Sequence, residues 1–211
     1  MATLTKILIM PFFGTLPEWW EKFEVPKGYD FLLDTDLEKF KIRVKKKLGI
    51  EYPGVYGNPK IWDYRPALGV LYEEEIRGFD FWGHTDPDCV YGDVDKWVTD
   101  EFLSKLDIHS NHHSYVNGCW SLYRNTPEVN RLFMQYPFWG DKMIHPEPNA
   151  WVEQEFSRLL ERSGLRYAYT FWQGWPYTTT PNLIKDDDGK LYQDGEEIMM
   201  LHFRRSKKWP L

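Results

Sequence analysis

The sequence has little cysteine, no excess of positive charge and no long apolar segment. Cys89 and Cys119 are its only cysteines, too few for a disulfide framework or a cysteine-rich zinc site. We therefore expect a reducing compartment, the cytoplasm. The net charge of −6 argues against nonspecific nucleic-acid binding, which depends on basic side chains that neutralise phosphates. The apolar run at 6–13 is short and contains Pro11, so it predicts a strand and not a transmembrane segment or signal peptide.

Several catalytic motifs are also missing. The sequence has no Gly-x-Gly-x-x-Gly fingerprint, Walker loop, His-Glu-x-x-His or Gly-x-Ser-x-Gly, which disfavours the enzyme classes built on them. The acidic segment Asp186–Gly189 does not have EF-hand spacing, and it predicts a hairpin turn. The segment His109–His113 holds three histidines. A metal site is one interpretation, but one loop seldom supplies a full ligand set, so we predict an exposed or acceptor-side loop.

Aromatic residues, in contrast, are abundant, at 18% with eleven tryptophans. Flat aromatic faces can cover the C–H groups of sugars while their polar tips form hydrogen bonds. Most of the tryptophans are nevertheless expected in the core. The surplus therefore indicates a well-filled core first and a carbohydrate-contacting surface second.

The first half of the sequence alternates between strand and helix signals. Ile7–Met10 is a continuous apolar run, typical of a strand buried on both faces of a mainly parallel sheet. Gly49 and Gly78 are expected to end two helices, and Pro66 is suited to the first turn of the second one. The alternation predicts a three-layer α/β domain. Its expected strands are 7–10, 29–33 and 79–82, and its expected helices are 17–23, 37–48 and 66–77.

Polar or glycine-containing segments follow each of these three strands, at Pro11–Gly14, Asp34–Asp36 and Asp86–Asp88. Ligands of open α/β sheets bind at the carboxyl ends of the strands, so we expect the three segments to meet in one crevice. Asp86 and Asp88 are separated by one residue and come shortly after the apolar run 79–82. Two carboxylates in this arrangement can share a hard divalent cation, which in turn can bind a nucleotide diphosphate.

The second half is less regular and shows no clear linker or internal repeat. We therefore predict one continuous domain, 1–211, with a nucleotide-binding half at 1–95 and an acceptor-binding half at 96–211. Turn signals near the end predict a C-terminal antiparallel meander. Thr126 and Asn149 are expected to cap two helices. The expected helices are 95–106, 126–136 and 149–163, and the expected strands are 182–185, 190–193 and 196–203.

Four stretches, at 60–67, 81–88, 118–126 and 201–203, together resemble GT-A type glycosyltransferases. Similar stretches occur in small enzymes of bacterial surface-polysaccharide clusters and of giant viruses, including chlorella-virus enzymes that build capsid glycans. The resemblance implies a GT-A (Rossmann-like) fold with a mainly parallel central sheet flanked by helices. One departure is Gly118-Cys119-Trp120, where relatives often have Gly-His or Gly-aromatic, and this puts donor-sugar contacts at 118–120 in doubt.

The resemblance also implies roles for individual residues. Asp88 would be the direct ligand of Mn²⁺ or Mg²⁺, with Asp86 nearer the ribose or a bound water and His202 completing the metal site. Positive side chains would pair with the diphosphate as negative charge develops on it. The further residues implied are Pro11, Phe12 and Gly14 beside the nucleobase and ribose, Asp36 or Asp34 at the base edge, Asp63 and Arg65 facing the donor, and Lys207, Arg204 or Arg205 at the diphosphate.

An inverting enzyme also needs a carboxylate that deprotonates the acceptor hydroxyl. Glu153 is the candidate base, because relatives often carry an acidic residue at the start of the corresponding helix, and Glu155 is the reserve. Both could equally be ordinary acids in a first helical turn, favoured by the helix dipole. A retaining enzyme would need no such base.

The predicted function is transfer of a hexose or deoxyhexose from a nucleotide sugar, expected to be a UDP-sugar, to a glycan or glycoprotein acceptor. A viral capsid glycan is one candidate acceptor, and in that case the compartment would be the host cytoplasm. Trp172, Trp175 and Tyr177 are expected to form the acceptor platform. Two alternatives remain: a non-catalytic carbohydrate-binding module, and a sugar nucleotidyltransferase, against which the missing glycine-rich basic loop near the first strand counts.

Overall fold

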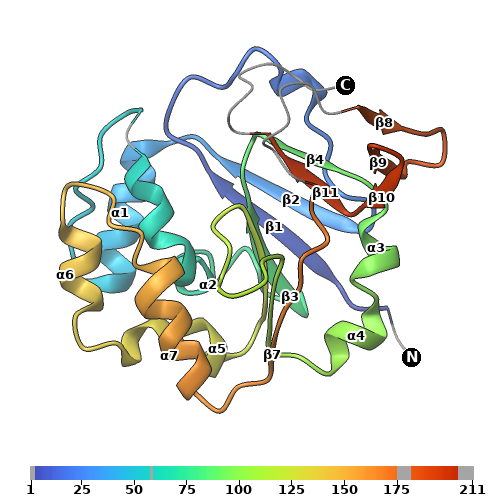
Figure 1. Ribbon diagram of the computed structural model, residues 1–211. Helices are drawn as coiled ribbons and strands as arrows, with labels where there is room; N and C mark the ends of the chain where they lie inside the picture. The colour runs from blue at the N-terminus through green and yellow to red at the C-terminus, as the bar shows by residue number, and fades with distance from the viewer. Residues whose placement is uncertain (1–2, 58, 175–181, 204–211) are drawn as a thin grey trace.

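The computed structural model describes residues 3–57, 59–174 and 182–203. Within them, six strands form one sheet in the order β2-β1-β3-β6-β5-β7 (Figure 1). β6 runs antiparallel to its neighbours β3 and β5, and the other pairs are parallel. The predicted α/β class with a mainly parallel sheet is confirmed. The strands are β1 Lys6–Pro11, β2 Tyr29–Asp34, β3 Phe81–Thr85, β5 Ile108–Ser110, β6 Trp120–Arg124 and β7 Tyr167–Tyr169.

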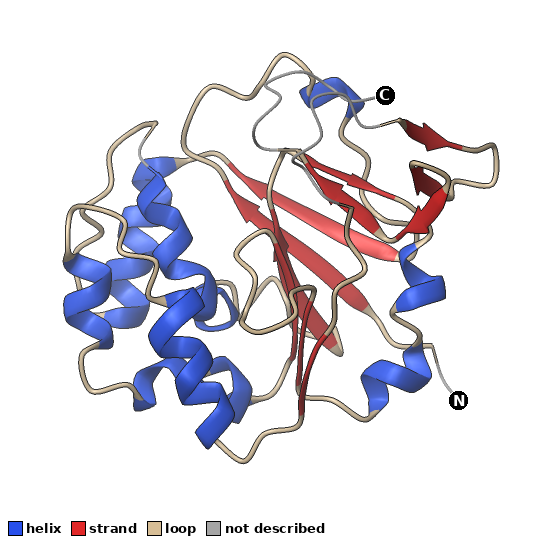
Figure 2. Cartoon of the chain, viewed as in Figure 1, coloured by secondary structure: helices blue, strands red, loops and turns tan. Residues whose placement is uncertain are grey.

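Helices cover both faces of this sheet, as the predicted three-layer arrangement requires (Figure 2). On one face, α1, α2, α5, α6 and α7 contribute to a single apolar core with the sheet. A second core, on the other face, includes residues of α3, α4, β4 and β11. The helices are α1 Leu37–Leu48, α2 Leu68–Leu71, α3 Val94–Trp97, α4 Asp100–Ser104, α5 Pro127–Asn130, α6 Trp139–Ile144 and α7 Ser157–Arg162. None of the helices in the described part of the chain is long and apolar enough to cross a membrane.

The helix α1 has the bounds that the sequence predicts. The Asp36 carboxylate accepts a hydrogen bond from the Lys39 amide at 3.0 Å, which satisfies one free N–H of the first turn. Gly49 ends the helix with a φ of 73°, a left-handed conformation that glycine adopts without steric cost.

The strand predicted at 79–82 lies two residues later and continues through Gly83 to Thr85. Gly83 therefore lies in the middle of β3, where it packs closely against the neighbouring strand. A Cβ there would lie 2.4 Å from the Ser121 backbone oxygen on β6, so only glycine allows the two strands to approach this closely. The strand consequently ends directly before Asp86.

Other predicted helices are shorter or of a different type. The helix expected at 17–23 is a 3₁₀ turn at Trp20–Lys22, and the one expected at 66–77 is a 3₁₀ segment, Pro59–Ala67, followed by α2. Pro66 lies inside that segment and has no amide to donate. The helix expected at 149–163 begins as a π-helix, Val152–Phe156, and continues as α7.

Two further predicted helices are each split. The helix expected at 95–106 divides into α3 and α4, because the Thr99 side chain caps a new helix by accepting from the Phe102 amide. The one expected at 126–136 divides into α5, capped by Thr126 as predicted, and a 3₁₀ turn at Leu132–Gln135.

The C-terminal meander is confirmed as β8 Leu183–Lys185, β9 Leu191–Gln193 and β10 Glu196–Ile198, with a turn at 186–189. The last predicted strand, 196–203, is in fact two. Its second part, β11 Met200–His202, leaves the meander and pairs antiparallel with β4 Cys89–Tyr91. This pairing brings the end of the described chain back to the segment that follows β3.

Candidate functional site

A cavity of about 810 Å³ lies at the carboxyl ends of the parallel strands. This volume is in the range of sites that enclose a small organic ligand. One part of its wall comes from the segment after β1, with Pro11 and Phe12. Asp86 and Asp88, which follow β3, also line it, as does His202 from β11. The expected crevice at this edge of the sheet is therefore present.

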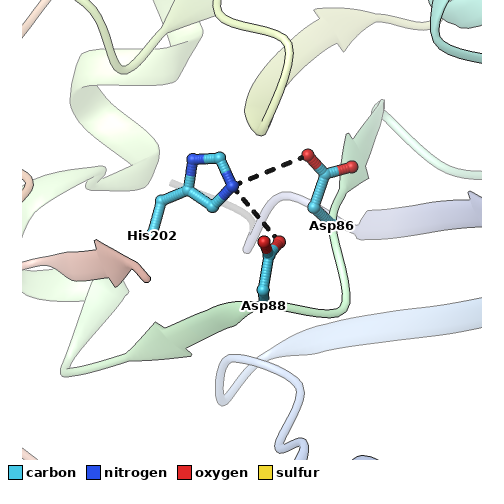
Figure 3. Close-up of side chains that lie close together, drawn as sticks. All are labelled: Asp86, Asp88 and His202. Atoms are coloured by element: carbon cyan, nitrogen blue, oxygen red, sulfur yellow. Dashed lines mark ion pairs between the residues drawn. The ribbon is translucent and has the colours of Figure 1, made fainter. Parts of the chain in front are cut away.

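Asp86, Asp88 and His202 form one cluster (Figure 3). The imidazole Nε2 of His202 lies 3.2 Å from Asp88 Oδ1 and 4.0 Å from Asp86 Oδ2. One ligand atom from each residue lies within 4.8 Å of the other two, and no other such group of three occurs among the described residues. The sheet register explains the approach, because His202 on β11 is paired with Cys89, the residue after Asp88.

The negative charge of the two carboxylates stabilises positive charge within the cluster. Burial raises the pKa of Asp86, against the effect of the nearby Arg65 guanidinium, and the Asp88 charge raises it further. Burial opposes charging of His202, but its hydrogen bond to Asp88 and the surrounding negative groups raise its pKa to about 9. Two carboxylates and an imidazole are a donor set that suits Mn²⁺, and the oxygen atoms also suit Mg²⁺. The residues present therefore fit a divalent ion.

Arg65 connects the cluster to the opposite wall of the cavity. Its guanidinium is paired with Asp86 and stands 5.8 Å from the centroid of the Trp62 ring. A Cβ at Gly118 would lie 2.4 Å from Arg65 Nη1 and 3.3 Å from Glu153 Oε1. Gly118 thus leaves the space that the guanidinium occupies, with the Glu153 carboxylate nearby.

The two candidate bases have different surroundings. Glu153 lines the cavity and comes from the π-helical segment 152–156. Glu155 forms an ion pair with Lys142 at 2.7 Å and is not among the residues that line the cavity. Of the two, only Glu153 faces the cluster of Asp86, Asp88 and His202 across one cavity.

Some predicted donor-binding residues have structural partners instead. Asp63 contributes to the cavity wall, but its carboxylate forms an almost fully buried ion pair with Lys60 at 2.7 Å. Asp36 caps α1, and Asp34 accepts a 2.7 Å hydrogen bond from the Tyr72 hydroxyl. Asp34, Asp36 and Gly14 are not among the residues that line the cavity.

Of the three residues expected to form the acceptor platform, the structure describes Trp172, which does not line the cavity. Trp172 packs into the second core, with ring centroids 5.5 Å from His109 and 5.7 Å from Phe102, so its ring is not part of the cavity wall. The other residues expected there or at the diphosphate, Trp175, Tyr177, Arg204, Arg205 and Lys207, lie outside the described residues.

His112 and His113 also line the cavity. The sequence predicted an exposed or acceptor-side loop for them, with a metal site as the other interpretation, and did not include them among the site residues. Their position becomes predictable only when β5 is known to run parallel to β3, which follows from the pairing of both strands with β6. The sequence analysis predicted none of the strands β4, β5, β6 and β7.

No curated protein matches this chain. Residues 31–146 match the family described as "Family of unknown function (DUF6625)", and this match spans more than half of the 211 residues.

Three solved structures are similar in fold. The first is a glycosyltransferase involved in the glycosylation of the major capsid of PBCV-1, with 15% identity over 80% of this chain and 82% of that chain, at a TM-score of 0.49. Mouse xyloside xylosyltransferase 1 in its apo form is 10% identical over 99% and 100%, also at 0.49. A197 from STIV is 12% identical over 93% and 94%, at 0.37. At scores below 0.5 these similarities define neither a reaction nor a substrate for this chain.

Proposed function

The chain belongs to DUF6625, a family of unknown function, and we propose that it is a metal-dependent glycosyltransferase that moves a hexose or deoxyhexose from a UDP-sugar to a glycan acceptor. One observation carries the proposal: two carboxylates and an imidazole converge at the carboxyl end of β3, inside a cavity large enough for a nucleotide sugar. Ligands of open α/β sheets bind at this edge. The order of the four stretches that resemble GT-A enzymes gives independent support.

Asp86, Asp88 and His202 would hold Mn²⁺ or Mg²⁺. When bound there, such an ion neutralises the diphosphate that leaves as the sugar–phosphate bond breaks. Besides the metal ion, Arg65 would supply positive charge in the same cavity. Its guanidinium lines the cavity and is paired with Asp86. Its role would be to orient the diphosphate and stabilise the charge that develops on it. Arg204 and Lys207 remain further candidates for this task.

Glu153 is the proposed base for an inverting reaction. The Glu153 carboxylate would accept the proton of the acceptor hydroxyl as this oxygen attacks the anomeric carbon of the sugar. Arg65 approaches the same point beside Gly118, so its guanidinium would lie close to the reacting groups. Pro11 and Phe12, on the β1 side of the cavity, would contact the nucleobase and ribose.

Calorimetry of UDP binding in the presence of Mn²⁺ tests the proposal. The wild-type chain should bind UDP, and Asp88→Ala should abolish metal-dependent binding. Asp187→Ala is a matched control, because it removes an exposed acid from the hairpin turn at 186–189, away from the cavity. Equal UDP affinity in wild type and Asp88→Ala would contradict the metal assignment. Release of UDP from a UDP-sugar would then establish transfer.

Assays of glycan binding and of nucleoside-triphosphate consumption distinguish the two alternatives. A carbohydrate-binding module would bind glycans without metal or nucleotide, and a nucleotidyltransferase would consume a nucleoside triphosphate and a sugar phosphate. The aromatic surplus favours the module less than the sequence suggested, because Trp82, Trp120 and Trp151 are fully buried. These rings stabilise the core and are not available to a ligand.

A further inference from the structure

Four aromatic side chains form one wall of the cavity: His112, His113, Tyr115 and Phe171, called the aromatic wall below. The His112 ring is stacked on Tyr115, with centroids 3.5 Å apart, and on His113, at 4.2 Å. Phe171 meets His113 edge to face at 5.6 Å. Packed aromatic rings of this kind present a combined apolar surface with polar ring edges, which suits a flat apolar or sugar ring.

The aromatic wall lies on the side of Asp86 opposite to Pro11 and Phe12. In the sheet, β1 is the neighbour of β3 on one side, whereas β5 is two strands away on the other. Strands are spaced by about 4.8 Å, so the end of β5 lies roughly 10 Å from the end of β3. β5 and β7 run in the same direction as β3, and the segments that follow them, with His112 and Phe171, therefore reach the same edge of the sheet. A nucleotide beside β1 would leave this far side for a second ligand.

The segment that carries the aromatic wall is held in place by buried polar side chains. The Asn117 side chain donates to the Asn111 carbonyl oxygen at 2.7 Å, and its own oxygen accepts from the Cys119 amide at 3.0 Å. The Asn111 side-chain oxygen accepts from the Trp172 amide at 2.9 Å, which ties the loop after β5 to the residue next to Phe171. The Ser157 hydroxyl accepts from the Val116 amide at 2.9 Å. A surface fixed in this way loses little conformational freedom when it binds a ligand.

The histidines of the wall suit a neutral ligand better than a metal ion. Burial and the neighbouring His113 lower the pKa of His112 to about 4, so its imidazole is uncharged at pH 7. Neither histidine belongs to a group of three metal-ligating side chains among the described residues. Aromatic rings with N–H and O–H groups at their edges match a pyranose, which has an apolar C–H face and a rim of hydroxyl groups.

We propose that the aromatic wall is the acceptor subsite and that it binds a pyranose ring of the acceptor glycan, across the metal cluster from the nucleotide. The inference rests on the proposed glycosyltransferase function. In this proposal the acceptor is bound by residues of the segment 109–115 and by Phe171, and not by Trp172. Glu153 lines the same cavity, so the aromatic wall and the proposed base share one ligand space.

Saturation-transfer NMR tests the subsite, with irradiation of the aromatic protons and with UDP and Mg²⁺ present. The probes are methyl pyranosides of the gluco, galacto, manno and xylo series. The wild-type protein should transfer saturation to the C–H protons of at least one probe. The variant His113→Ala/Phe171→Ala should weaken its binding by roughly three- to tenfold for each ring removed. His113→Tyr/Phe171→Tyr keeps both rings and should keep the transfer, and His145→Ala is a control for an exposed histidine outside the cavity wall.

The outcomes that overturn the subsite are distinct from failure of the proposed function. The subsite is wrong if no pyranoside responds with the wild-type protein or if the double alanine variant responds equally. It is also wrong if that variant loses affinity for UDP instead, because the aromatic wall would then hold the nucleobase. If the wild type does not bind UDP but a pyranoside still binds at the wall, the glycosyltransferase proposal fails and the sugar site remains. Thermal unfolding of each variant shows whether a lost signal reflects a lost fold.

Discussion

The Nε2 atom of His202 lies 3.2 Å from Asp88 Oδ1, although the two residues come from opposite halves of the chain. The antiparallel pairing of β11 with β4 produces this contact, since it aligns His202 with Cys89. His202 is therefore fixed to the cluster by a backbone register and not by a flexible loop. A side chain held in this way is preorganised as a ligand.

His202→Ala should weaken Mn²⁺ binding by about tenfold or more, because it removes one of three protein ligands and leaves the carboxylates in position. The electron paramagnetic resonance signal of free Mn²⁺ during a titration measures this affinity. His145→Ala is the control, since His145 does not line the cavity. If His202→Ala binds Mn²⁺ as tightly as wild type, the imidazole is not a ligand and the contact with Asp88 is only structural.

Gly118→Ala should reduce activity with little change in stability. The added Cβ would lie 2.4 Å from Arg65 Nη1, and the end of a flexible arginine can move away at small cost. That movement would displace the guanidinium from its position beside Gly118 while its ion pair with Asp86 can persist. We expect kcat/KM for UDP-sugar turnover to fall about tenfold, as is typical when a positioned charge is lost, and the free energy of unfolding to change by less than about 1 kcal/mol.

A double variant tests whether the loss of activity in Gly118→Ala depends on Arg65. Arg65→Ala/Gly118→Ala should be no less active than Arg65→Ala alone, because the two changes act through the same guanidinium. Additive losses of kcat/KM in the double variant would show that Gly118 matters for another reason, such as direct contact with the donor.

How far the sequence predicts this molecule depends on the element. The bounds of α1 follow from local signals, namely the Asp36 cap and Gly49, and β1 follows from a continuous apolar run. Of the three strand ends expected in one crevice, those of β1 and β3 line the cavity, whereas Asp34 and Asp36 do not. Asp86 and Asp88 could be identified in the same way. The resemblance gave Arg65 and Glu153 as site candidates, but it did not predict that both lie beside Gly118. That arrangement depends on the 3₁₀ segment 59–67 and the π-helix 152–156. Neither has a periodicity that distinguishes it from an α-helix in a sequence.

Asp63 is a second residue whose role in the structure could not be predicted from the sequence. From the sequence its carboxylate was a candidate donor contact, but Lys60 Nζ lies 2.7 Å away and both side chains are almost completely buried. The ammonium also donates to the Lys142 carbonyl oxygen at 2.8 Å, and the carboxylate accepts from the Asn149 amide at 3.2 Å. The pair therefore joins the 3₁₀ segment to α6 and to the loop before the π-helix. Because its partners Lys142 and Asn149 are distant in the sequence, no local sequence pattern predicts this role.

Lys60→Met should destabilise the protein by about 3–5 kcal/mol, because it leaves a buried carboxylate without its counter-ion. Urea unfolding followed by circular dichroism measures the change. Lys60→Met/Asp63→Leu should recover part of the loss, since no charge then remains buried. If the double variant is less stable than Lys60→Met, the Asp63 carboxylate contributes mainly through its hydrogen bond from Asn149.

The stability of the protein should fall as the pH drops below about 6.5, in part because of His109. Burial lowers the pKa of His109 in the folded state to about 3, whereas its ordinary value is 6.5. Between these values the unfolded chain binds a proton at this residue and the folded chain does not. The difference favours unfolding by up to about 1.4 kcal/mol per pH unit. The contribution is fully present above pH 6.5 and decreases progressively toward pH 3.

His109→Gln isolates this contribution, because glutamine does not titrate and can still bond to the Thr170 hydroxyl, which lies 2.8 Å from His109 Nε2. The variant should be less stable than wild type at pH 7, since a shaped buried ring is lost. Its free energy of unfolding should nevertheless depend less steeply on pH between 6 and 4, by close to one proton. Urea unfolding at several pH values, for wild type and variant together, gives both slopes. Equal slopes would mean that His109 is protonated in the folded protein, and the neutral ring in the core would be ruled out.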